Sequence, residues 1–200
     1  WVPPLVRAGV EATLVERDLD LLTPMAKEGL VEVALSVTTL RPRLARIMEP
    51  RAASPARRLE TVRRLTDAGI PVSVLMAPLI PMINDAELEA VMEAVHAAGA
   101  RDSGYVVLRL PHELKELFRD WLTQHFPDRA AHVMARVQDL RGGKDYDAAF
   151  GKRLRGEGVF AKLLRQRFEK SHRHLGFPGT PPLRTDLFRP PGDENQLQLF

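Results

Sequence analysis

The sequence predicts an α/β fold built on a parallel β-sheet. Three strongly apolar segments begin near residues 31, 70 and 104, and amphipathic helix patterns lie between them. Strands that alternate with helices at this spacing form successive βαβ units. The strand segments are almost continuously apolar, which is typical of strands covered on both faces. Right-handed crossovers between such units give either an open sheet or part of a (β/α) barrel.

The first two strands and the helix between them follow from short local patterns. Residues 12–16 (ATLVE) are expected to form a short strand, and a helix is expected from Asp18 to Glu28. Gly29 ends this helix, because glycine adopts the left-handed conformation that closes many helices. The apolar run at residues 30–37 is the next strand.

The helix after this strand has a clear start and an amphipathic pattern. Ser54 suits the N-cap position, and Pro55 suits the first helical position, where a missing N–H costs little. One stripe is apolar: Ala56, Leu59, Val62 and Leu65. The charged residues are expected to point outward: Arg57, Arg58, Glu60, Arg63, Arg64 and Asp67. Glu60 and Arg64 are spaced for an i,i+4 ion pair.

A second unit of the same kind follows Gly69. Residues 70–77 are expected to form a buried strand, and Asn84 or Asp85 is expected to cap the next helix. The inward positions of that helix are Leu88, Val91, Met92 and Val95. Gly99 ends it, and residues 104–110 form the last strand before Pro111.

The remainder of the chain is predicted to be helical and then extended. Residues 112–140 form two helices broken at Pro127, and the glycines of 141–143 provide a hinge. A basic helix covers 158–174, with four residues facing inward: Phe160, Leu163, Leu164 and Phe168. The Pro- and Gly-rich tail is expected to run along the surface, with Leu187–Phe188 and the terminal Leu197, Leu199 and Phe200 docking on the body. We therefore divide the chain into residues 1–124, the α/β part, and 125–200, a helical basic extension.

Composition is that of an ordinary soluble protein, with 44% hydrophobic and 28% charged residues. No apolar run approaches the roughly 20 residues that span a bilayer, and the first residues lack the pattern of a signal peptide. We expect a cytoplasmic protein with no membrane partner.

Positive charge is concentrated in residues 141–173, which contain ten Lys or Arg and four acidic residues. The whole chain has a net charge of +3, so the remainder is slightly acidic. Such a segment attracts phosphate backbones, which makes nucleic acid a candidate partner. The alternative is that these residues are solvated faces of helices.

The chain contains no cysteine. This excludes disulfides, thiolate nucleophiles, and a zinc or iron–sulfur site held by cysteines of this chain. The six histidines are scattered, so no metal site is expected: His96, His112, His125, His132, His172 and His174. No phosphate-binding loop or serine nucleophile motif occurs either.

Candidate binding residues lie at the ends of the predicted strands, where parallel α/β folds bind ligands. Ser36, Thr38 and Thr39 follow the apolar part of one strand, and Ala77 follows the next. Small side chains let a ligand approach the backbone, and hydroxyls can bond a ribose or a carboxylate. The same hydroxyls also commonly cap strand ends. Arg109, at the end of the last strand, either pairs with an acid inside the fold or contacts an anionic ligand.

The order of three segments resembles a known family: VALSVTTL, then RIMEPRAASPARRLETVRRLTDAGIPVSVLMAPLIPMIND, then AGARDSGYVVLRLP. It is similar to the later half of the radical S-adenosylmethionine (SAM) domain of the spore photoproduct lyase-like, or "DNA repair photolyase", group. Relatives in this group also carry the RGG-x-YD and LRTDLF segments seen here. The resemblance extends from about Leu14 to Phe200, and its most specific part is EP-x-x-x-SP-x-x-R followed by AP.

This resemblance implies a partial TIM-type (β/α) barrel of six parallel strands, of which this chain would supply the later four and a C-terminal extension. In the family, a C-x-x-x-C-x-x-C loop binds a [4Fe–4S] cluster, which reductively cleaves SAM and generates a substrate radical. By resemblance, Ser36 and Ala77 contact SAM, and Glu49–Pro50 and Ser54–Pro55 have structural roles. Thr38 and Arg109 complete the set of candidate cofactor-binding residues.

The sequence departs from the family in ways that leave three hypotheses open. The cluster cysteines are absent, residues 1–11 do not match, and Glu11 stands where relatives have a lysine. The first hypothesis is that the chain is a fragment of a radical SAM lyase-type enzyme, with SAM and a cluster as cofactors and with DNA as one candidate substrate. The alternatives are a non-catalytic nucleic-acid-binding module that uses residues 141–173, and an inactive fragment with an open sheet edge near residues 12–16.

Overall fold

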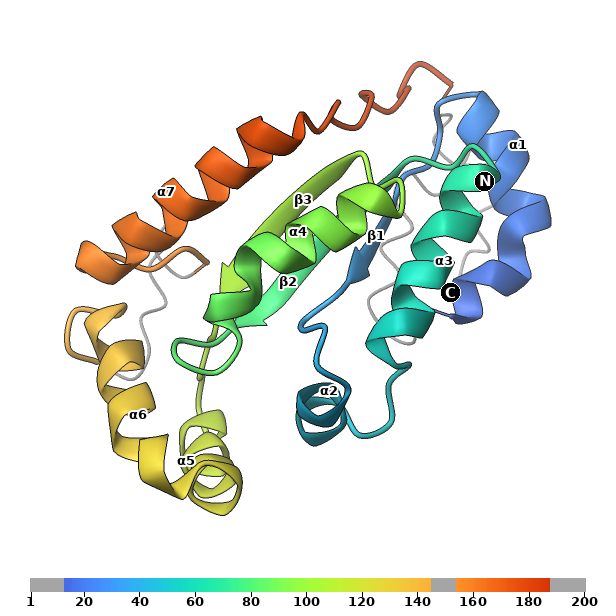
Figure 1. Ribbon diagram of the computed structural model, residues 1–200. Coiled ribbons are helices and arrows are strands. Elements are labelled where there is room, and N and C mark those ends of the chain that lie inside the picture. Colours follow the sequence, from blue (N-terminus) through green and yellow to red (C-terminus); the bar gives the residue numbers. More distant parts are fainter. Residues whose placement is uncertain (1–12, 145–153, 188–200) are drawn as a thin grey trace, which may run out of the picture.

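The computed structural model describes residues 13–144 and 154–187. It contains a three-stranded parallel sheet in the order β1-β2-β3, formed by β1 (Val33–Ser36), β2 (Val72–Leu79) and β3 (Asp102–Val107). The α-helices in the described part are α1 (Leu19–Lys27), α2 (Pro42–Met48), α3 (Pro55–Asp67), α4 (Leu88–Ala97), α5 (Leu114–His125), α6 (Ala130–Asp139) and α7 (Gly158–Leu175). Figure 1 shows the sheet at the centre of these helices.

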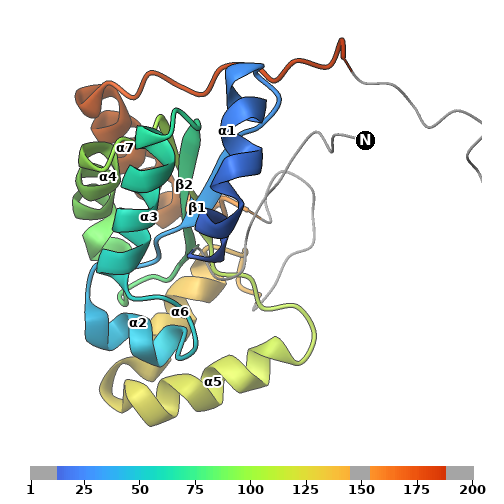
Figure 2. The ribbon, with the colours of Figure 1, turned by 90° about the vertical axis from the view of Figure 1, so that its right-hand side faces the viewer.

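Six of the seven α-helices in the described part form two groups around the sheet. α3, α4 and α7 lie together on one face of it, and α2, α5 and α6 lie beyond the carboxyl ends of the strands (Figure 2). The parallel alternation of strand and helix agrees with the predicted fold class and is compatible with part of a (β/α) barrel. None of the helices in the described part is long and apolar enough to cross a membrane.

The strand predicted at residues 12–16 is wrong over its described residues. Residues 14–18 form the 3-10 helix η1 (Leu14–Asp18), so three of the four predicted strands occur in the described part of the chain. Val15 is buried in the core and Leu14 is exposed, so the segment has the alternation of buried and exposed residues that is also typical of a strand. We attribute the 3-10 helix to Glu16, because side chains of α3 bind its carboxylate and hold this segment against α3 instead of beside a strand.

Glu16 is the centre of a polar cluster that fastens η1 to α3. Its oxygens accept hydrogen bonds from Arg57 (2.6 and 2.8 Å), Thr61 (2.6 Å) and Arg64 (2.9 Å). The hydrogen bond from Arg57 is the largest of the effects that lower the pKa of Glu16 to about 2, from an ordinary 4.5. This cluster therefore stabilises the fold only while Glu16 is ionised.

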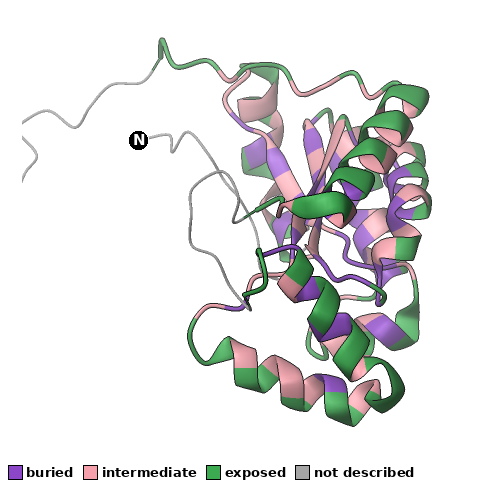
Figure 3. Cartoon of the chain, turned by 90° about the vertical axis from the view of Figure 1, so that its left-hand side faces the viewer, coloured by how far each residue is buried: buried purple, intermediate pink, exposed green. Residues whose placement is uncertain are grey.

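The main core lies between the sheet and the helices on its covered face. Val62 and Leu65 of α3 are fully buried there, as predicted, whereas Ala56 is exposed. The inward positions predicted for α4 are confirmed: Leu88, Val91, Met92 and Val95. A second apolar cluster joins α2, α5 and α6 to the strand ends, and its buried members are Leu44, Ile80, Ile83, Leu110, Leu122, Val133, Met134 and Val137. Figure 3 shows buried positions along the sheet and exposed outer faces on α5 and α7.

The helix caps agree with the sequence at α3 and differ at α4. Ser54 is the N-cap of α3 and accepts a hydrogen bond from the backbone N–H of Arg57 at 3.3 Å. The ion pair of Glu60 and Arg64 also forms, at 3.1 Å. α4 begins one turn later than expected, after the 3-10 helix η2 (Asp85–Glu87), and the side chain of Asn84 does not cap it.

The C-terminal part contains the predicted helices. α5 and α6 are separated by the 3-10 helix η3 (Pro127–Arg129), and α7 packs against α4. Within α7, Leu164 is buried but Leu163 is 47% exposed, so its predicted inward position is wrong. His172 of α7 contacts Asp102 at the start of β3, with 2.7 Å between Nε2 and Oδ1.

The segment after α7 is extended along the surface, as expected. The backbone N–H of Gly179 donates to the carbonyl of Arg101, and that of Arg184 donates to the carbonyl of Gly29, each at 2.9 Å. Leu187 is half exposed. The docking predicted for Phe188 and the terminal apolar residues, and the strand end at residue 12, lie outside the described residues.

Candidate functional site at the carboxyl ends of the strands

The two faces of the sheet differ in burial and in side-chain size. Residues that point toward α3, α4 and α7 are fully buried, whereas alternate residues are half-buried and mostly small. The half-buried set is Ala34, Ser36, Ser73, Leu75, Ala77, Gly104 and Val106. This less covered face is therefore lined by side chains that leave room close to the backbone.

Ser36 and Ala77 lie on this same face, in neighbouring strands. Ser36 pairs with Leu75 in the parallel ladder, and Ala77 is two residues further toward the carboxyl end of β2. Two residues along a strand correspond to about 7 Å. The geometry brings together the two residues that the resemblance assigns to SAM, while their binding role stays a prediction.

Gly104 belongs to the same face and was not singled out from the sequence. It pairs with Leu75, and a Cβ atom at position 104 would lie 2.9 Å from the Cδ2 of Leu75. The glycine thus lets the leucine lie across β3. The available sequence signal was the glycine itself, because glycine inside a strand often marks a close approach.

Thr38 is buried just beyond β1, and its polar groups are engaged. Its hydroxyl donates to Oε2 of Glu49 at 2.8 Å, and its carbonyl accepts from Nδ2 of Asn84 at 2.9 Å. A ligand that bonded the Thr38 hydroxyl would compete with Glu49. Thr38 therefore shapes the rim of the strand, and its predicted contact with a cofactor remains untested.

A buried arginine fixes the end of β1. Arg58, predicted to point outward, is only 7% exposed, so that prediction is wrong. It donates to the carbonyl of Ser36 at 2.9 Å and to that of Ala53 at 3.1 Å, and it forms an ion pair with Glu49 at 2.9 Å. Helix periodicity predicted that Arg58 lies on the exposed face of α3 with its charged neighbours. Its side chain is long enough to reach the end of β1 instead.

Asn84 joins the ends of β1 and β2. Its side chain is completely buried, and Oδ1 accepts a hydrogen bond from the N–H of Ile80 at 2.7 Å. Nδ2 donates to the carbonyls of Thr38, at 2.9 Å, and Pro78, at 3.0 Å. Both N–H groups of the amide and its oxygen therefore form hydrogen bonds that hold the two strand ends in place.

Glu87 likewise stabilises the loop after β1. Its carboxylate accepts hydrogen bonds from the Thr39 hydroxyl (2.7 Å), the N–H of Leu40 (2.9 Å) and Nε of Arg41 (2.7 Å). Arg41 also donates to the carbonyl of Ile83. The basic segment that follows β1 is thus partly an internal fastening between α2 and the start of α4.

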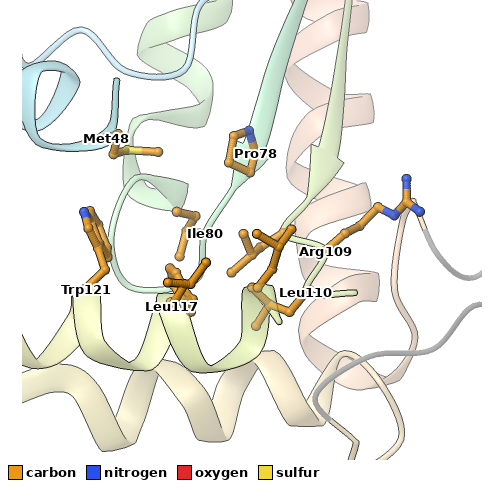
Figure 4. Close-up of a pocket in the computed structure, with 10 residues that line it drawn as sticks. Met48, Pro78, Ile80, Arg109, Leu110, Leu117 and Trp121 are labelled. Atoms are coloured by element: carbon orange, nitrogen blue, oxygen red, sulfur yellow. The ribbon is translucent and has the colours of Figure 1, made fainter. Parts of the chain in front are cut away.

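Arg109 lies at a pocket of about 290 Å³, next to the strand ends. Pro78 lines the same pocket, but the guanidinium of Arg109 extends away from it (Figure 4). Arg109 therefore lies at the edge of this pocket and does not point its charge into it. Its predicted cofactor contact stays a prediction.

Several cations of the basic segment are engaged inside the fold. The buried Arg141 donates to the carbonyl of Leu108 at 2.7 Å, so the predicted hinge is anchored to the end of β3. Arg155 lies over the ring of Tyr105, 4.4 Å from its centroid. Arg167 binds Glu89 through two hydrogen bonds of 2.8 and 2.6 Å. These three residues make contacts within the fold. The cations on the outer face of α7 are exposed: Lys162, Arg165, Lys170 and Arg173.

The β1–β2 half of the candidate site falls within one recognised sequence family. Residues 6–95 match the Radical SAM superfamily. This match includes Ser36, Ala77 and Asn84, but not Gly104 or Arg109. The resemblance at the level of the superfamily is thereby confirmed over these residues.

The similar proteins are themselves uncharacterized. One from Mycobacterium bovis and one from Mycobacterium tuberculosis (strain H37Rv) are each 28% identical over 166 residues, which cover 82% of this chain and 47% of each relative. An uncharacterized protein of Acidianus two-tailed virus is 40% identical over 70 residues, 35% of this chain and 23% of the viral protein. The chain thus spans about half the length of its mycobacterial relatives, and none of these proteins supports a photoproduct lyase or DNA substrate by name.

The two cofactors of the radical SAM superfamily fit this chain differently. A cysteine-bound [4Fe–4S] cluster does not fit, because the chain has no cysteine. In the described part, no group of three or more His, Asp or Glu residues is placed to hold a metal ion. The adenosyl part of SAM is more compatible, because a small-residue face with the Ser36 hydroxyl at its rim can accept a flat ring and a ribose.

Proposed function

We propose that this chain provides the SAM-contacting β-strands of a radical SAM protein. The observation that carries the proposal is the position of Ser36 and Ala77 on one small-residue face at adjacent strand ends, inside the matched segment 6–95. Parallel α/β sheets bind ligands at this end of their strands. The proposal concerns SAM binding, and no reaction step is assigned through a cluster that this chain cannot hold with its own thiolates.

Each residue has a defined part in this proposal. The Ser36 hydroxyl donates to the methionyl carboxylate of SAM, or donates to or accepts from a ribose hydroxyl. Ala77 leaves room for the adenosyl group against β2, and Gly104 leaves room for the side chain of Leu75 at the neighbouring strand. Arg58 and Asn84 hold the two strand ends in register. When bound beside a reduced cluster supplied by further residues, SAM would provide a deoxyadenosyl radical for hydrogen abstraction.

SAM binding to the isolated chain tests the proposal without any cluster. Isothermal titration should give a saturable, one-to-one interaction that Ala77→Leu abolishes, because the added carbons fill the adenosyl position. Ser73→Leu is the matched control: it lies on the same strand and face, about 13 Å toward the other end, and should leave the Kd unchanged. Ser36→Ala should raise the Kd about threefold to tenfold, the effect of one hydrogen bond. Equal binding by wild type and Ala77→Leu would refute the site.

Membership of the spore photoproduct lyase-like group is a finer proposal. It rests on the order of Glu49–Pro50, Ser54–Pro55 and Ala77–Pro78, which match the motif of that group. The structural role expected for the first two pairs agrees with the contacts of Glu49 and Ser54. The discriminating measurement is anaerobic assay of the chain joined to a cluster-bearing segment, with DNA photoproducts as substrate and deoxyadenosine as the readout.

Nucleic-acid binding is the second candidate function, and one observation favours it. Lys162, Lys170 and Arg173 are exposed on α7, where they are accessible to phosphates. Charge reversal of Lys162 and Lys170 should weaken DNA binding and reduce its salt dependence by about two phosphate contacts. Arg167 is unsuitable for this test because its loss also breaks the pairing with Glu89. DNA binding that is unchanged by the two reversals would refute this surface.

A further inference from the structure

The pocket beside Arg109 is an apolar site with walls from separate parts of the fold. It has a volume of about 290 Å³. Met48 of α2, Pro78 of β2 and Ile80 lie on one side (Figure 4). The remaining walls come from the residues after β3 and from α5: Leu108, Arg109, Leu110, Leu114, Leu117, Phe118 and Trp121. The pocket therefore forms only when α2, α5 and the two strand ends are assembled.

The polar groups around this pocket are used elsewhere. The indole Nε1 of Trp121 donates to the carbonyl of Ile47 at 3.3 Å. The carbonyl of Leu108 accepts from Arg141, and the guanidinium of Arg109 points away from the pocket. What faces the pocket is mainly carbon, so a complementary ligand is apolar at the end that enters it.

Aromatic side chains give one wall a fixed shape. The ring of Trp121 stacks with that of Phe118 at a centroid distance of 5.6 Å and an interplanar angle of 17°. It also contacts Phe126 at 5.4 Å. Held by these rings and by its hydrogen bond to Ile47, the indole presents a rigid aromatic surface. Such a surface favours a flat ring, because aromatic groups stack or meet edge to face.

The rim of the pocket distinguishes a binding site from a packing defect. Leu114 is 44% exposed and Leu117 is 60% exposed, although both are large apolar side chains. Exposed leucines beside an open apolar pocket extend the surface that a ligand can cover. The pocket also lies at the carboxyl ends of β2 and β3, where ligands of parallel α/β folds bind.

We propose that this pocket binds an aromatic group of one or two rings on a small-molecule ligand. A dry, apolar cavity of about 150 Å³ accepts benzene in another protein, so a pocket about twice that size suits a two-ring group. Pro78 follows Ala77 directly, which places the pocket next to the proposed SAM contact. Resting on the proposed function, the ligand is then the substrate, with its aromatic end held in the pocket and its reactive end toward the adenosyl group.

The experiment uses the neutral naphthalene dye prodan, whose emission shifts to the blue in apolar surroundings. The background variant Trp1→Phe leaves Trp121 as the single tryptophan, because the chain has two. Prodan should bind with one-to-one saturation and quench Trp121 by energy transfer. Leu114→Lys combined with Leu117→Lys should raise the Kd at least tenfold. Leu21→Lys, on an equally exposed leucine of α1, should leave it unchanged.

The outcomes separate this inference from the proposed function. Both rim residues are exposed, so the double variant should keep the wild-type melting temperature and the wild-type SAM affinity. Prodan affinity that is equal in wild type and the double variant, or binding without quenching of Trp121, would overturn the pocket. Prodan binding in a chain that shows no SAM binding would leave the pocket standing and overturn its link to SAM.

Discussion

Replacing Asn84 by alanine tests how the strand ends are held. The change removes three hydrogen bonds: one from the N–H of Ile80 and two to the carbonyls of Thr38 and Pro78. Each is worth about 0.5–1.5 kcal/mol net, which gives about 1.5–4.5 kcal/mol for the three, and the partners left unsatisfied inside the protein exclude the lower part of that summed range. We expect a loss of about 3 kcal/mol in the free energy of unfolding, or about 6–12 °C in Tm for a chain of this size.

Equilibrium unfolding in urea, followed by circular dichroism, measures this loss. Gln166→Ala is the control, because Gln166 is an exposed amide on α7 and its removal should change the free energy by less than 0.5 kcal/mol. Asn84→Asp adds a second comparison: it keeps the acceptor for Ile80 but sets a carboxylate against two carbonyls. That variant should be less stable at neutral pH and recover at low pH, where the protonated acid donates one hydrogen bond. A loss below 1 kcal/mol for Asn84→Ala would refute the reasoning.

Three further predictions concern contacts away from Asn84. Since the folded pKa of Glu16 is about 2, its contribution to stability is complete above its ordinary pKa of 4.5 and is lost as the pH falls toward 2. Glu16→Gln should therefore lower the free energy of unfolding by about 1–2 kcal/mol at pH 7, a range that allows for the solvent around the arginine partners. Urea titrations should show little difference between the variant and the wild type at pH 2. Arg167→Met should release α7 from Glu89, so amide exchange in α7 should accelerate more than in β2, and equal acceleration would contradict the pairing role. Gly104→Ala should destabilise the protein by about 1–3 kcal/mol by crowding Leu75, and the double variant with Leu75→Ala should regain part of that loss in thermal melts; no regain would exclude the proposed clash.

The elements with strong periodicity were predictable from the sequence. The strands that became β1, β2 and β3 were expected within a few residues of their bounds, because long apolar runs bounded by Gly and Pro leave few alternatives. The inward face of α4 was also predictable, because four apolar residues recur at helical spacing.

The errors come from contacts between distant residues. Residues 14–18 have a strand-like composition, but the carboxylate of Glu16 is bound by α3, and this contact selects a 3-10 helix instead. Arg58 has the spacing of an outward residue, yet two carbonyls and Glu49 near the strand end draw it inside. Periodicity cannot predict such long polar side chains, because the partners that satisfy them are distant in sequence or set by loop geometry.

The position of the candidate site could be predicted from the sequence, but the side chains that hold the strand ends in place could not. Strand-end logic placed Ser36 and Ala77 at one end of a parallel sheet, and the observed register puts them on one face. The buried amide of Asn84 looked like a helix cap, because both roles use the same residue type at the same place in the chain. The pocket beside Trp121 was not predicted, because its walls come from four segments whose docking no local pattern specifies.

The extended segment after α7 has a consequence for biosynthesis. Its backbone hydrogen bonds join Arg184 to Gly29 and Gly179 to Arg101, so this extended segment lies along the amino-terminal ends of β1 and β3. A ribosome delivers Gly29 long before Arg184, and contacts with such sequence separation close late and slowly. The nascent protein therefore leaves that end uncovered until residue 184 has been made, an interval in which chaperones or neighbouring chains have access to it.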